Sequence, residues 1–380
     1  MKLFRISTIP LSLNILLKGQ LRFLNRHFEV TAISGSGPDL ETVAEREGVR
    51  TLEVEMQRQI SPLKDLLTLW KLYRCFSKEK PDMIHSITPK AGLLSMVAGK
   101  LAGIPIRMHT FTGLIFPTRT GNMQKILIKM DKLLCSCATH IYPEGQGVKN
   151  DLQKYRITNK PLKIIANGNV NGIDTAFFSR SQIPEKQLQE LQQSLGILPD
   201  DFVFIFVGRL VGDKGINELV RAFKEINLPQ TKLLLVGPLE TDLDALLPET
   251  LKEIENNKSI ISAGYQDDVR PYFAISDALV FPSYREGFPN VVLQAGAMQL
   301  PAIVSDINGC NEIIIDGENG LIVPPKNTEQ LRAAMTRLVT DKELYIELKA
   351  KTRDQIVQNY EQAVVWQAIL EEYKNAEQDV

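Results

Sequence analysis

Short apolar runs alternate with longer amphipathic segments along almost the whole chain, and this alternation restricts the fold more than any other feature. Runs such as FVFIFVG (202–208) and KLLLVG (232–237) are continuously apolar, as in strands buried on both faces of a parallel sheet. Parallel strands require crossover connections, which are usually helices. The chain is therefore predicted to be an α/β protein with doubly wound parallel sheets.

The pattern predicts two domains, for which 380 residues are sufficient. The Gly- and Asn-rich segment GNVNGID (168–174) predicts a boundary near residue 170. In the first half, strands are expected at the N-terminus and at 28–34, 82–87, 106–111 and 139–143, with helices near 12–27, 62–79, 91–102 and 123–137. In the second half, strands are expected at 202–208, 232–237, 259–264, 277–282, 301–305 and 320–324.

The net charge of −1 conceals an asymmetry between the halves. Residues 1–170 contain 25 Lys and Arg against 13 Asp and Glu, so this half carries +12 and the remainder carries −13. A basic half suggests an anionic partner. It contains no nucleic-acid recognition motif and no aromatic-basic interleaving, so we expect no nucleic acid and favour an anionic membrane surface.

One helix of the basic half has the spacing of a membrane-binding segment. Lys18, Arg22 and Arg26 recur every four residues, on one face of the predicted helix 12–27. Leucines cover its other side, and a second basic stripe follows in helix 123–137 (Leu13, Leu17, Leu21 and Leu24; Lys125, Lys129 and Lys132). Helices of this kind lie against anionic lipid, although a solvated basic face is the ordinary alternative. We predict membrane contact through Lys18, Arg22 and Arg26.

No run approaches the roughly 18 apolar residues of a membrane-spanning helix. Polar residues and Pro10 interrupt the N-terminus, which favours a strand and a helix over an export signal. The four cysteines fit neither a disulfide framework nor a zinc pattern, and reduced cysteines indicate the cytoplasm (Cys75, Cys135, Cys137 and Cys310). We therefore expect a cytoplasmic protein, peripheral on the inner face of the membrane.

Two loops of the second half carry candidate chemistry. GRLVGDKG (208–215) follows an apolar strand, and Arg209 and Lys214 place two cations on a Gly-flanked turn suited to a diphosphate. An ordinary surface turn is the alternative, and the spacing is not that of a Walker loop. SYREGFPNVV (283–292) follows the candidate strand 277–282, and Glu286 in it can accept hydrogen bonds from sugar hydroxyls or simply complement a helix dipole.

Together, GRLVGDKG and EGFPNVVLQAGAMQLP resemble the donor-binding half of family 4 glycosyltransferases. The resemblance covers nearly the whole chain and is most specific over residues 200–325. It implies the glycosyltransferase B fold, in which two Rossmann-like doubly wound domains face a central cleft. It further implies catalytic roles for Arg209 and Lys214 at the donor diphosphate and for Glu286 at the donor sugar, with other loop residues binding the donor (Gly208, Gly287, Phe288 and Asn290).

The resemblance also implies a domain organisation. Residues 1–170 would bind the acceptor, 171–355 would bind the nucleotide sugar, and a helix within 356–380 would cross back to the first domain. This last segment has helical apolar spacing, with Trp366 as a large anchor (Val365, Ile369 and Tyr373).

The chain departs from the family pattern at one donor position. The family has two glutamates eight positions apart, of which the second binds ribose hydroxyls, and here that position is Gln294. An amide can still accept one ribose hydroxyl but carries no charge, so the resemblance assigns Gln294 to donor binding with an uncertain affinity.

In the first half, HSITPKAGLLSMVAGKLAGIPIRMHTFTG (85–113) resembles the acceptor-domain segment of bacterial members that build cell-surface polysaccharide. The family often has a histidine before the final glycine, where this chain has Thr112; His109 either substitutes for it or is an ordinary buried strand histidine. Lys90, in a strand-to-helix loop, either binds an acceptor or donor phosphate or is simply solvated.

The resemblance implies a retaining transfer of a hexose or N-acetylhexosamine from a nucleotide sugar, with UDP as the expected nucleotide. The acceptor would be a polyprenyl-diphosphate-linked or other glycan in bacterial surface polysaccharide synthesis. No cofactor and no metal are expected, because the nucleotide sugar is a substrate and Asp267-Asp268 does not form a metal-binding dyad. Two alternatives remain: an epimerase, which needs acid/base groups at the sugar, and a non-catalytic sensor, which Gln294 and Thr112 keep open.

Overall fold

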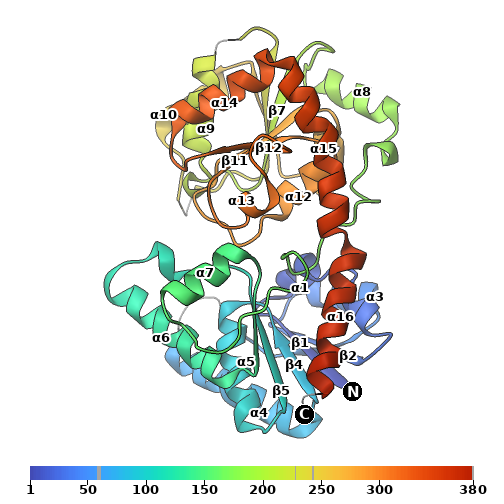
Figure 1. Ribbon diagram of the computed structural model, residues 1–380, viewed down its shortest axis with the longest axis vertical. Coiled ribbons are helices and arrows are strands. Elements are labelled where there is room, and N and C mark those ends of the chain that lie inside the picture. The colour runs from blue at the N-terminus through green and yellow to red at the C-terminus, as the bar shows by residue number, and fades with distance from the viewer. Residues whose placement is uncertain (58–60, 227, 242–243, 379–380) are drawn as a thin grey trace. The chain divides into compact units, whose positions relative to one another are not determined.

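The computed structural model describes residues 1–57, 61–226, 228–241 and 244–378. The chain forms two compact units: Met1–Gly172 together with Gln362–Val380, and Ile173–Glu361 (Figure 1). The second unit ends after residue 361 rather than at 355, because helix α15 (Lys342–Tyr360) keeps Tyr360 buried in the core of that unit.

The first unit is a six-stranded parallel sheet in the order β3-β2-β1-β4-β5-β6. Its strands are β1 (Lys2–Ile6), β2 (Glu29–Ser34), β3 (Arg50–Glu53), β4 (Met83–Ser86), β5 (Ile106–Phe111) and β6 (His140–Pro143). Its helices are α1 (Pro10–Leu16), α2 (Gln20–Leu24), α3 (Pro38–Glu47), α4 (Pro62–Glu79), α5 (Pro89–Leu101), α6 (Gly121–Cys137), α7 (Gln146–Lys154) and, from the end of the chain, α16 (Gln362–Gln378).

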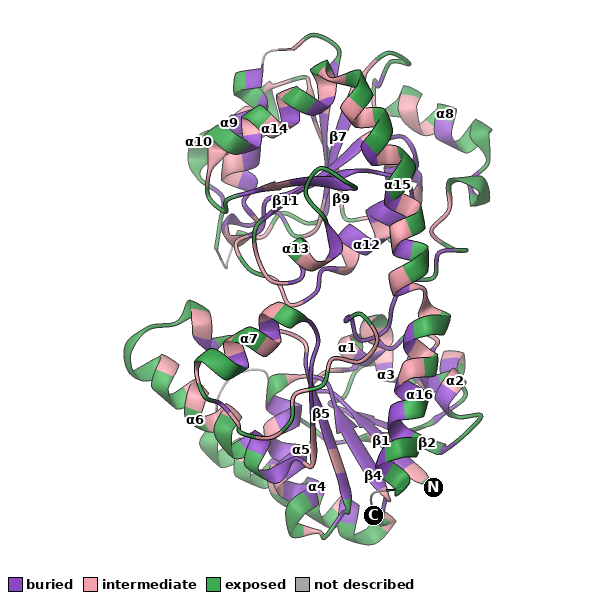
Figure 2. Cartoon of the chain, viewed as in Figure 1, coloured by how far each residue is buried: buried purple, intermediate pink, exposed green. Residues whose placement is uncertain are grey.

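This sheet is buried on both faces, which explains its apolar strands (Figure 2). Successive strand residues point to opposite faces. In β1, Leu3 joins the core beneath α1, α2, α3 and α16, whereas Phe4 and Ile6 join the core beneath α4, α5, α6 and α7. The helices therefore form one layer on each side of the sheet.

The predicted helix 12–27 is in fact two short helices. Gly19 has a φ of +81° and separates α1 from α2, so Lys18 lies between the helices and Arg26 lies beyond α2. Lys18 and Arg26 therefore share no helix face with Arg22. The leucines are fully buried in the protein's own core (Leu13, Leu17, Leu21 and Leu24). The prediction that Lys18, Arg22 and Arg26 lie on one face of a single helix is wrong, and membrane contact through them stays a prediction.

Helix α16 packs on the first unit, close to α2. The side chains at the apolar spacing are buried among strand residues of the first sheet (Val365, Ile369 and Tyr373). Trp366 Nε1 donates to Asn171 Oδ1 at 2.8 Å. The Trp366 ring also lies against Gly19, where a Cβ would come within 2.7 Å of it. Gly19 thus allows both the positive φ between the two helices and the close contact with Trp366 of α16.

The second unit is also a six-stranded parallel sheet, in the order β12-β11-β10-β7-β8-β9. Its strands are β7 (Phe202–Val207), β8 (Thr231–Val236), β9 (Ile260–Gly264), β10 (Ala278–Phe281), β11 (Ala302–Ser305) and β12 (Gly320–Val323). Its helices are α8 (Glu185–Ser194), α9 (Ile216–Ile226), α10 (Pro248–Asn256), α11 (Arg270–Ala274), α12 (Asn290–Ala297), α13 (Cys310–Ile313), α14 (Thr328–Thr340) and α15. The predicted fold class, two doubly wound α/β units, is confirmed.

Candidate active site

The two predicted donor loops meet at one point of the second sheet. Strands β7 and β10 are neighbours, but the chain continues from β7 to β8 on one side and from β10 to β11 on the other. Open α/β sheets bind ligands beyond the carboxyl ends of their strands at such a switch point. The loop after β7 contains a 3₁₀ turn (Gly212–Lys214), and the loop after β10 contains Glu286.

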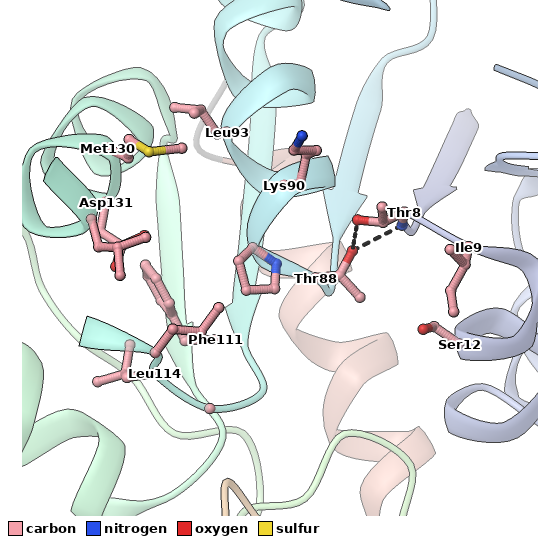
Figure 3. Close-up of a pocket in the computed structure, with 14 residues that line it drawn as sticks. Thr8, Ile9, Ser12, Thr88, Lys90, Leu93, Phe111, Leu114, Met130 and Asp131 are labelled. Carbon is pink, nitrogen blue, oxygen red and sulfur yellow. Dashed lines mark hydrogen bonds between the residues drawn. The ribbon is translucent and has the colours of Figure 1, made fainter. Parts of the chain in front are cut away.

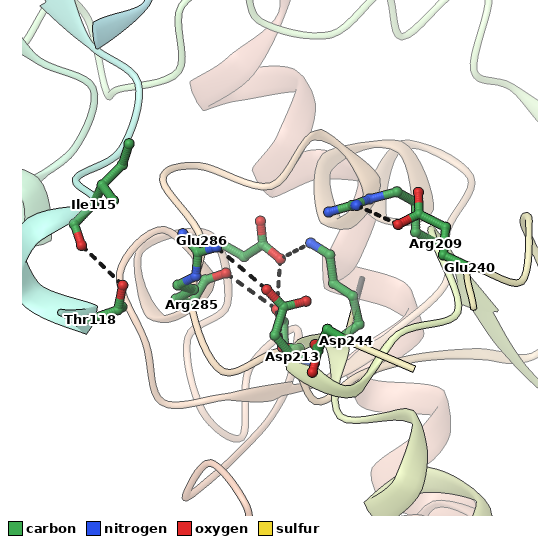
Figure 4. Close-up of polar contacts among 10 residues, drawn as sticks. Ile115, Thr118, Arg209, Asp213, Glu240, Asp244, Arg285 and Glu286 are labelled. Carbon is green, nitrogen blue, oxygen red and sulfur yellow. Dashed lines mark hydrogen bonds and ion pairs between the residues drawn. The ribbon is translucent and has the colours of Figure 1, made fainter. Parts of the chain in front are cut away.

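The centre of this site is the ion pair between Lys214 and Glu286 (Figure 4). Lys214 Nζ donates to Glu286 Oε1, and the buried Ser283 hydroxyl donates to the same oxygen at 2.7 Å. The side chains of Lys214 and Glu286 are 19% and 16% exposed, so the pair is shielded from bulk water but still reachable. Lys214 Nζ also lies 5.4 Å from the centre of the Phe281 ring, a cation–π contact that helps to hold it.

Close backbone contacts hold the loops together. The Tyr284 N–H donates to the Asp213 carbonyl at 2.9 Å. Gly215 has a φ of +73°, and a Cβ there would lie 2.2 Å from the Pro282 carbonyl oxygen. Only glycine satisfies both conditions. The loop after β7 can therefore approach the loop after β10 closely enough for Lys214 to reach Glu286.

Arg209 is held away from this pair (Figure 4). Its Nη1 donates to Glu240 Oε2 at 2.9 Å, and half of its side chain is exposed. Gly208, directly after β7, lies against the backbone of Gly237, where a Cβ would come within 1.9 Å of the Gly208 carbonyl oxygen. The structure thus brings Lys214 and Glu286 together and pairs Arg209 with a different carboxylate.

The remaining predicted donor residues lie at the start of α12. Asn290 and Gln294 are four residues apart, so they share a helix face, and both are half-buried, as is Gly287 in the preceding loop. Phe288 differs, because its ring is buried and packs against Tyr360 with ring centres 5.5 Å apart. The Phe288 side chain thus anchors the loop to the core, and the assignment of Phe288 to donor binding stays a prediction that concerns its backbone.

The first unit has a cavity of about 250 Å³ at its own switch point, between β1 and β4 (Figure 3). The Thr8 N–H and Oγ1 hydrogen-bond to Thr88 Oγ1 at 2.9 and 2.8 Å and join the two strand ends. Asp131 lines the same cavity, and burial raises the pKa of its carboxyl to about 7. Most other lining side chains are apolar (Ile9, Leu93, Phe111, Leu114, Leu127 and Met130).

Lys90 is the predicted acceptor-domain residue that lines this cavity. Its Nζ donates to Asp65 Oδ1 at 2.8 Å, and its side chain is largely buried. Lys90 is therefore a buried, ion-paired lysine in the first turn of α5, in contrast to the solvated alternative. Thr112 is half-buried, and its hydroxyl donates to the Ile87 carbonyl at 2.9 Å.

His109 does not line the cavity. It is fully buried, its Nδ1 hydrogen-bonds to Ser86 Oγ at 2.8 Å, and its ring lies so close to α5 that a Cβ on Gly92 would meet it. Burial lowers the pKa of His109 to about 3, so its imidazole is neutral. The suggestion that His109 replaces the missing family histidine is wrong, because its side chain is enclosed by the core.

Two site residues escaped the sequence analysis. Ser283 orients Glu286. It could have been predicted, because it lies just beyond the carboxyl end of β10, where ligands bind to open α/β sheets. Asp131 gave no signal, because an acidic residue between Lys129 and Lys132 on an amphipathic helix has the pattern of a surface position.

Two doubly wound units, each with polar residues at its switch point, are the architecture of the glycosyltransferase B fold. A solved structure, Anabaena HepE in complex with UDP and glucose, matches 99% of this chain and 100% of its own with a TM-score of 0.82 at 17% identity. This likeness shows the fold.

The family follows from the sequence comparisons. The family model described as Glycosyl transferases group 1 matches residues 188–355, and the one described as Glycosyltransferase Family 4 matches residues 19–175. The Staphylococcus aureus capsular polysaccharide biosynthesis glycosyltransferase CapM is 29% identical over 97% of this chain and 95% of its own. An Escherichia coli UDP-Gal:alpha-D-GlcNAc-diphosphoundecaprenol alpha-1,3-galactosyltransferase is 29% identical over 88% of this chain and 86% of its own. The chain belongs to glycosyltransferase family 4.

Among the helices that the structure describes, none is both long and apolar enough to cross a membrane.

Proposed function

We propose that this enzyme transfers a hexose or N-acetylhexosamine from a UDP-sugar to a polyprenyl-diphosphate-linked glycan in bacterial surface polysaccharide synthesis. The observation that carries the proposal is the Lys214–Glu286 pair at the β7/β10 switch point. It joins a cation that suits a diphosphate to a carboxylate that suits sugar hydroxyls. The names of the relatives support the choice of substrates: HepE was solved with UDP, and the Escherichia coli relative is named for a UDP-sugar and a diphosphoundecaprenol-linked acceptor.

The reaction proposed is a same-face displacement. The bond between the anomeric carbon and the donor phosphate oxygen breaks, and a bond from this carbon to the acceptor oxygen forms with retention. The proton of the acceptor hydroxyl passes to the departing diphosphate, so no protein nucleophile is required. Lys214 stabilises the charge that grows on this leaving group, and Arg209 joins it once a diphosphate competes with Glu240. Glu286 binds the sugar hydroxyls, and no metal or cofactor is needed in this scheme.

The acceptor is assigned to the first unit. The cavity at the β1/β4 switch point is mostly apolar, with Lys90 and Asp131 as its charged members. An apolar wall suits a sugar face or the start of a lipid chain, and Lys90 suits a phosphate. A lipid-linked acceptor would place the enzyme in the cytoplasm, at the inner face of the membrane.

Release of UDP tests the proposal. A panel of UDP-sugars should contain one that raises the melting temperature, because a ligand that binds only the folded state stabilises it. With that donor, UDP should be released far faster when a lipid-linked acceptor is present. Conversion of the donor to its epimer without UDP release would instead show an epimerase, and tight binding with neither reaction would show a sensor.

A further inference from the structure

The outer side of α4 carries an unusual exposed apolar stripe. Leu63, Leu66 and Leu67 are 81%, 64% and 62% exposed, and Trp70 and Tyr73 continue the stripe at helical spacing. The opposite side of the helix is buried in the first unit (Thr68, Leu72 and Phe76). Scattered surface leucines need no explanation, but a continuous stripe of this length marks a surface that something covers.

Cations border this stripe. Four basic side chains of α4 are exposed beside it (Lys64, Lys71, Arg74 and Lys78), and the Arg74 guanidinium lies 4.8 Å from the centre of the Trp70 ring. Both acidic residues of the helix are paired with cations from other elements: Asp65 with Lys90 and Glu79 with Arg50. The exposed side of α4 is therefore apolar and positively charged.

Helix α6 repeats this combination in the same layer. α5 packs against both α4 and α6, and all three helices cover the same face of the first sheet (Figure 1). The exposed side of α6 carries apolar and basic residues together, and the residues of both helices are coloured largely as exposed in Figure 2 (Met123, Ile126 and Leu133; Lys125, Lys129 and Lys132). We call the exposed sides of α4 and α6 the α4/α6 face.

We propose that the α4/α6 face docks on an anionic lipid surface. The leucines and the rings of Trp70 and Tyr73 enter the boundary between headgroups and acyl chains, while the lysines and Arg74 bind anionic headgroups. Charge favours anionic lipid over a symmetric dimer: two copies joined through this face would set the cationic face against itself, whereas anionic lipid complements it. The proposal rests on the proposed function only in explaining why docking is useful, since it brings the enzyme to a lipid-linked acceptor.

Vesicle binding tests the docking surface. The full chain should bind phosphatidylcholine vesicles that contain phosphatidylglycerol, bind pure phosphatidylcholine far less, and lose binding as salt rises. The double variant Leu66→Ser/Trp70→Ser should lower the partition coefficient at least about tenfold. Ile346→Ser is the matched control, because Ile346 on α15 is as exposed as Leu66, at 64%, and lies outside the face.

Two charge-reversal variants separate the electrostatic from the apolar contribution to vesicle binding. Lys64→Glu/Lys71→Glu should abolish the preference for anionic vesicles, whereas Lys351→Glu on α15 should leave it unchanged. Wild-type protein that ignores anionic vesicles, or α4 variants that bind like wild type, would overturn the proposal. So would an α4 variant that converts a dimer to a monomer without altering vesicle binding, because the face would then be an interface between copies.

UDP release with soluble and with vesicle-embedded acceptors distinguishes a wrong docking surface from a wrong proposed reaction. The α4 variants should release UDP normally with a water-soluble acceptor analogue and slowly with an acceptor embedded in vesicles. If neither the wild-type protein nor the variants transfer sugar but vesicle binding follows the expected pattern, the docking surface is supported and the proposed reaction is contradicted.

Discussion

Replacing Lys214 with alanine should separate the chemistry of the site from its folding. In the structure, Lys214 and Glu286 are 19% and 16% exposed, so their ion pair lies between a surface pair and a buried one. Its loss leaves Glu286 with the hydrogen bond from Ser283, and we expect a cost of about 1–2 kcal/mol in the free energy of unfolding. A folded enzyme should therefore remain.

The kinetic cost should be larger. Because Lys214 stabilises charge that develops on the leaving diphosphate, its removal should cost about 3 kcal/mol of transition-state stabilisation, a hundredfold or more in kcat. Binding of UDP should weaken and binding of uridine should hardly change. Steady-state UDP release and titration calorimetry with both ligands measure these effects. Lys224→Ala is the control, because Lys224 pairs with Glu253 on an exposed surface and should change neither quantity.

A Lys214→Ala enzyme that retains kcat within about threefold would contradict a role of Lys214 at the leaving group. An equal loss of affinity for uridine and UDP would also contradict it, because Lys214 would then hold the loop and not the diphosphate.

Three further outcomes follow from the structure. Gln294→Glu should keep activity and tighten donor binding modestly, because a carboxylate accepts two charge-assisted ribose hydrogen bonds; a donor Kd at least about tenfold weaker in a folded variant would argue that Gln294 does not face the ribose. Ending the chain after Glu361 removes α16 from the core of the first unit and should lower the melting temperature sharply; unchanged melting would contradict the packing described. Burial lowers the pKa of His85 and of His109, so below pH 6.5 the unfolded state binds more protons than the folded state, and the free energy of unfolding decreases as the pH decreases. The raised pKa of the Asp131 carboxyl opposes this, because the folded state binds one additional proton there between about pH 4 and 7. Stability measured by urea unfolding should thus fall by about 1.4 kcal/mol per pH unit between pH 6 and 5, and about twice as steeply in Asp131→Asn.

Much of the fold could be predicted from the sequence, because a buried parallel strand leaves a continuous apolar run. All six strands of the second sheet lie within one residue of their predicted positions. β3 was missed because its sequence RTLE has no such run and lies at the edge of its sheet. The first helix was predicted as one piece because periodicity does not show that Gly19 adopts a positive φ.

The candidate site was predictable only in part. The switch-point rule and the two loop motifs led to Lys214 and Glu286, which the structure joins. Side-chain direction was not predictable: a phenylalanine after Glu286 could face either the ligand or the core, and Phe288 packs on Tyr360. For the same reason the sequence could not decide between the two alternatives for His109, and the structure shows a buried strand histidine.

The mass of the acceptor after reaction tests the central claim most directly. The assay incubates wild-type enzyme with the UDP-sugar that stabilises it and with a polyprenyl-diphosphate-linked glycan. The mass of the extracted lipid is then measured by mass spectrometry. The account predicts an acceptor heavier by one sugar residue with wild-type enzyme and an unchanged acceptor with Lys214→Ala. An unchanged acceptor with wild-type enzyme, under conditions in which donor and acceptor both bind, would contradict it.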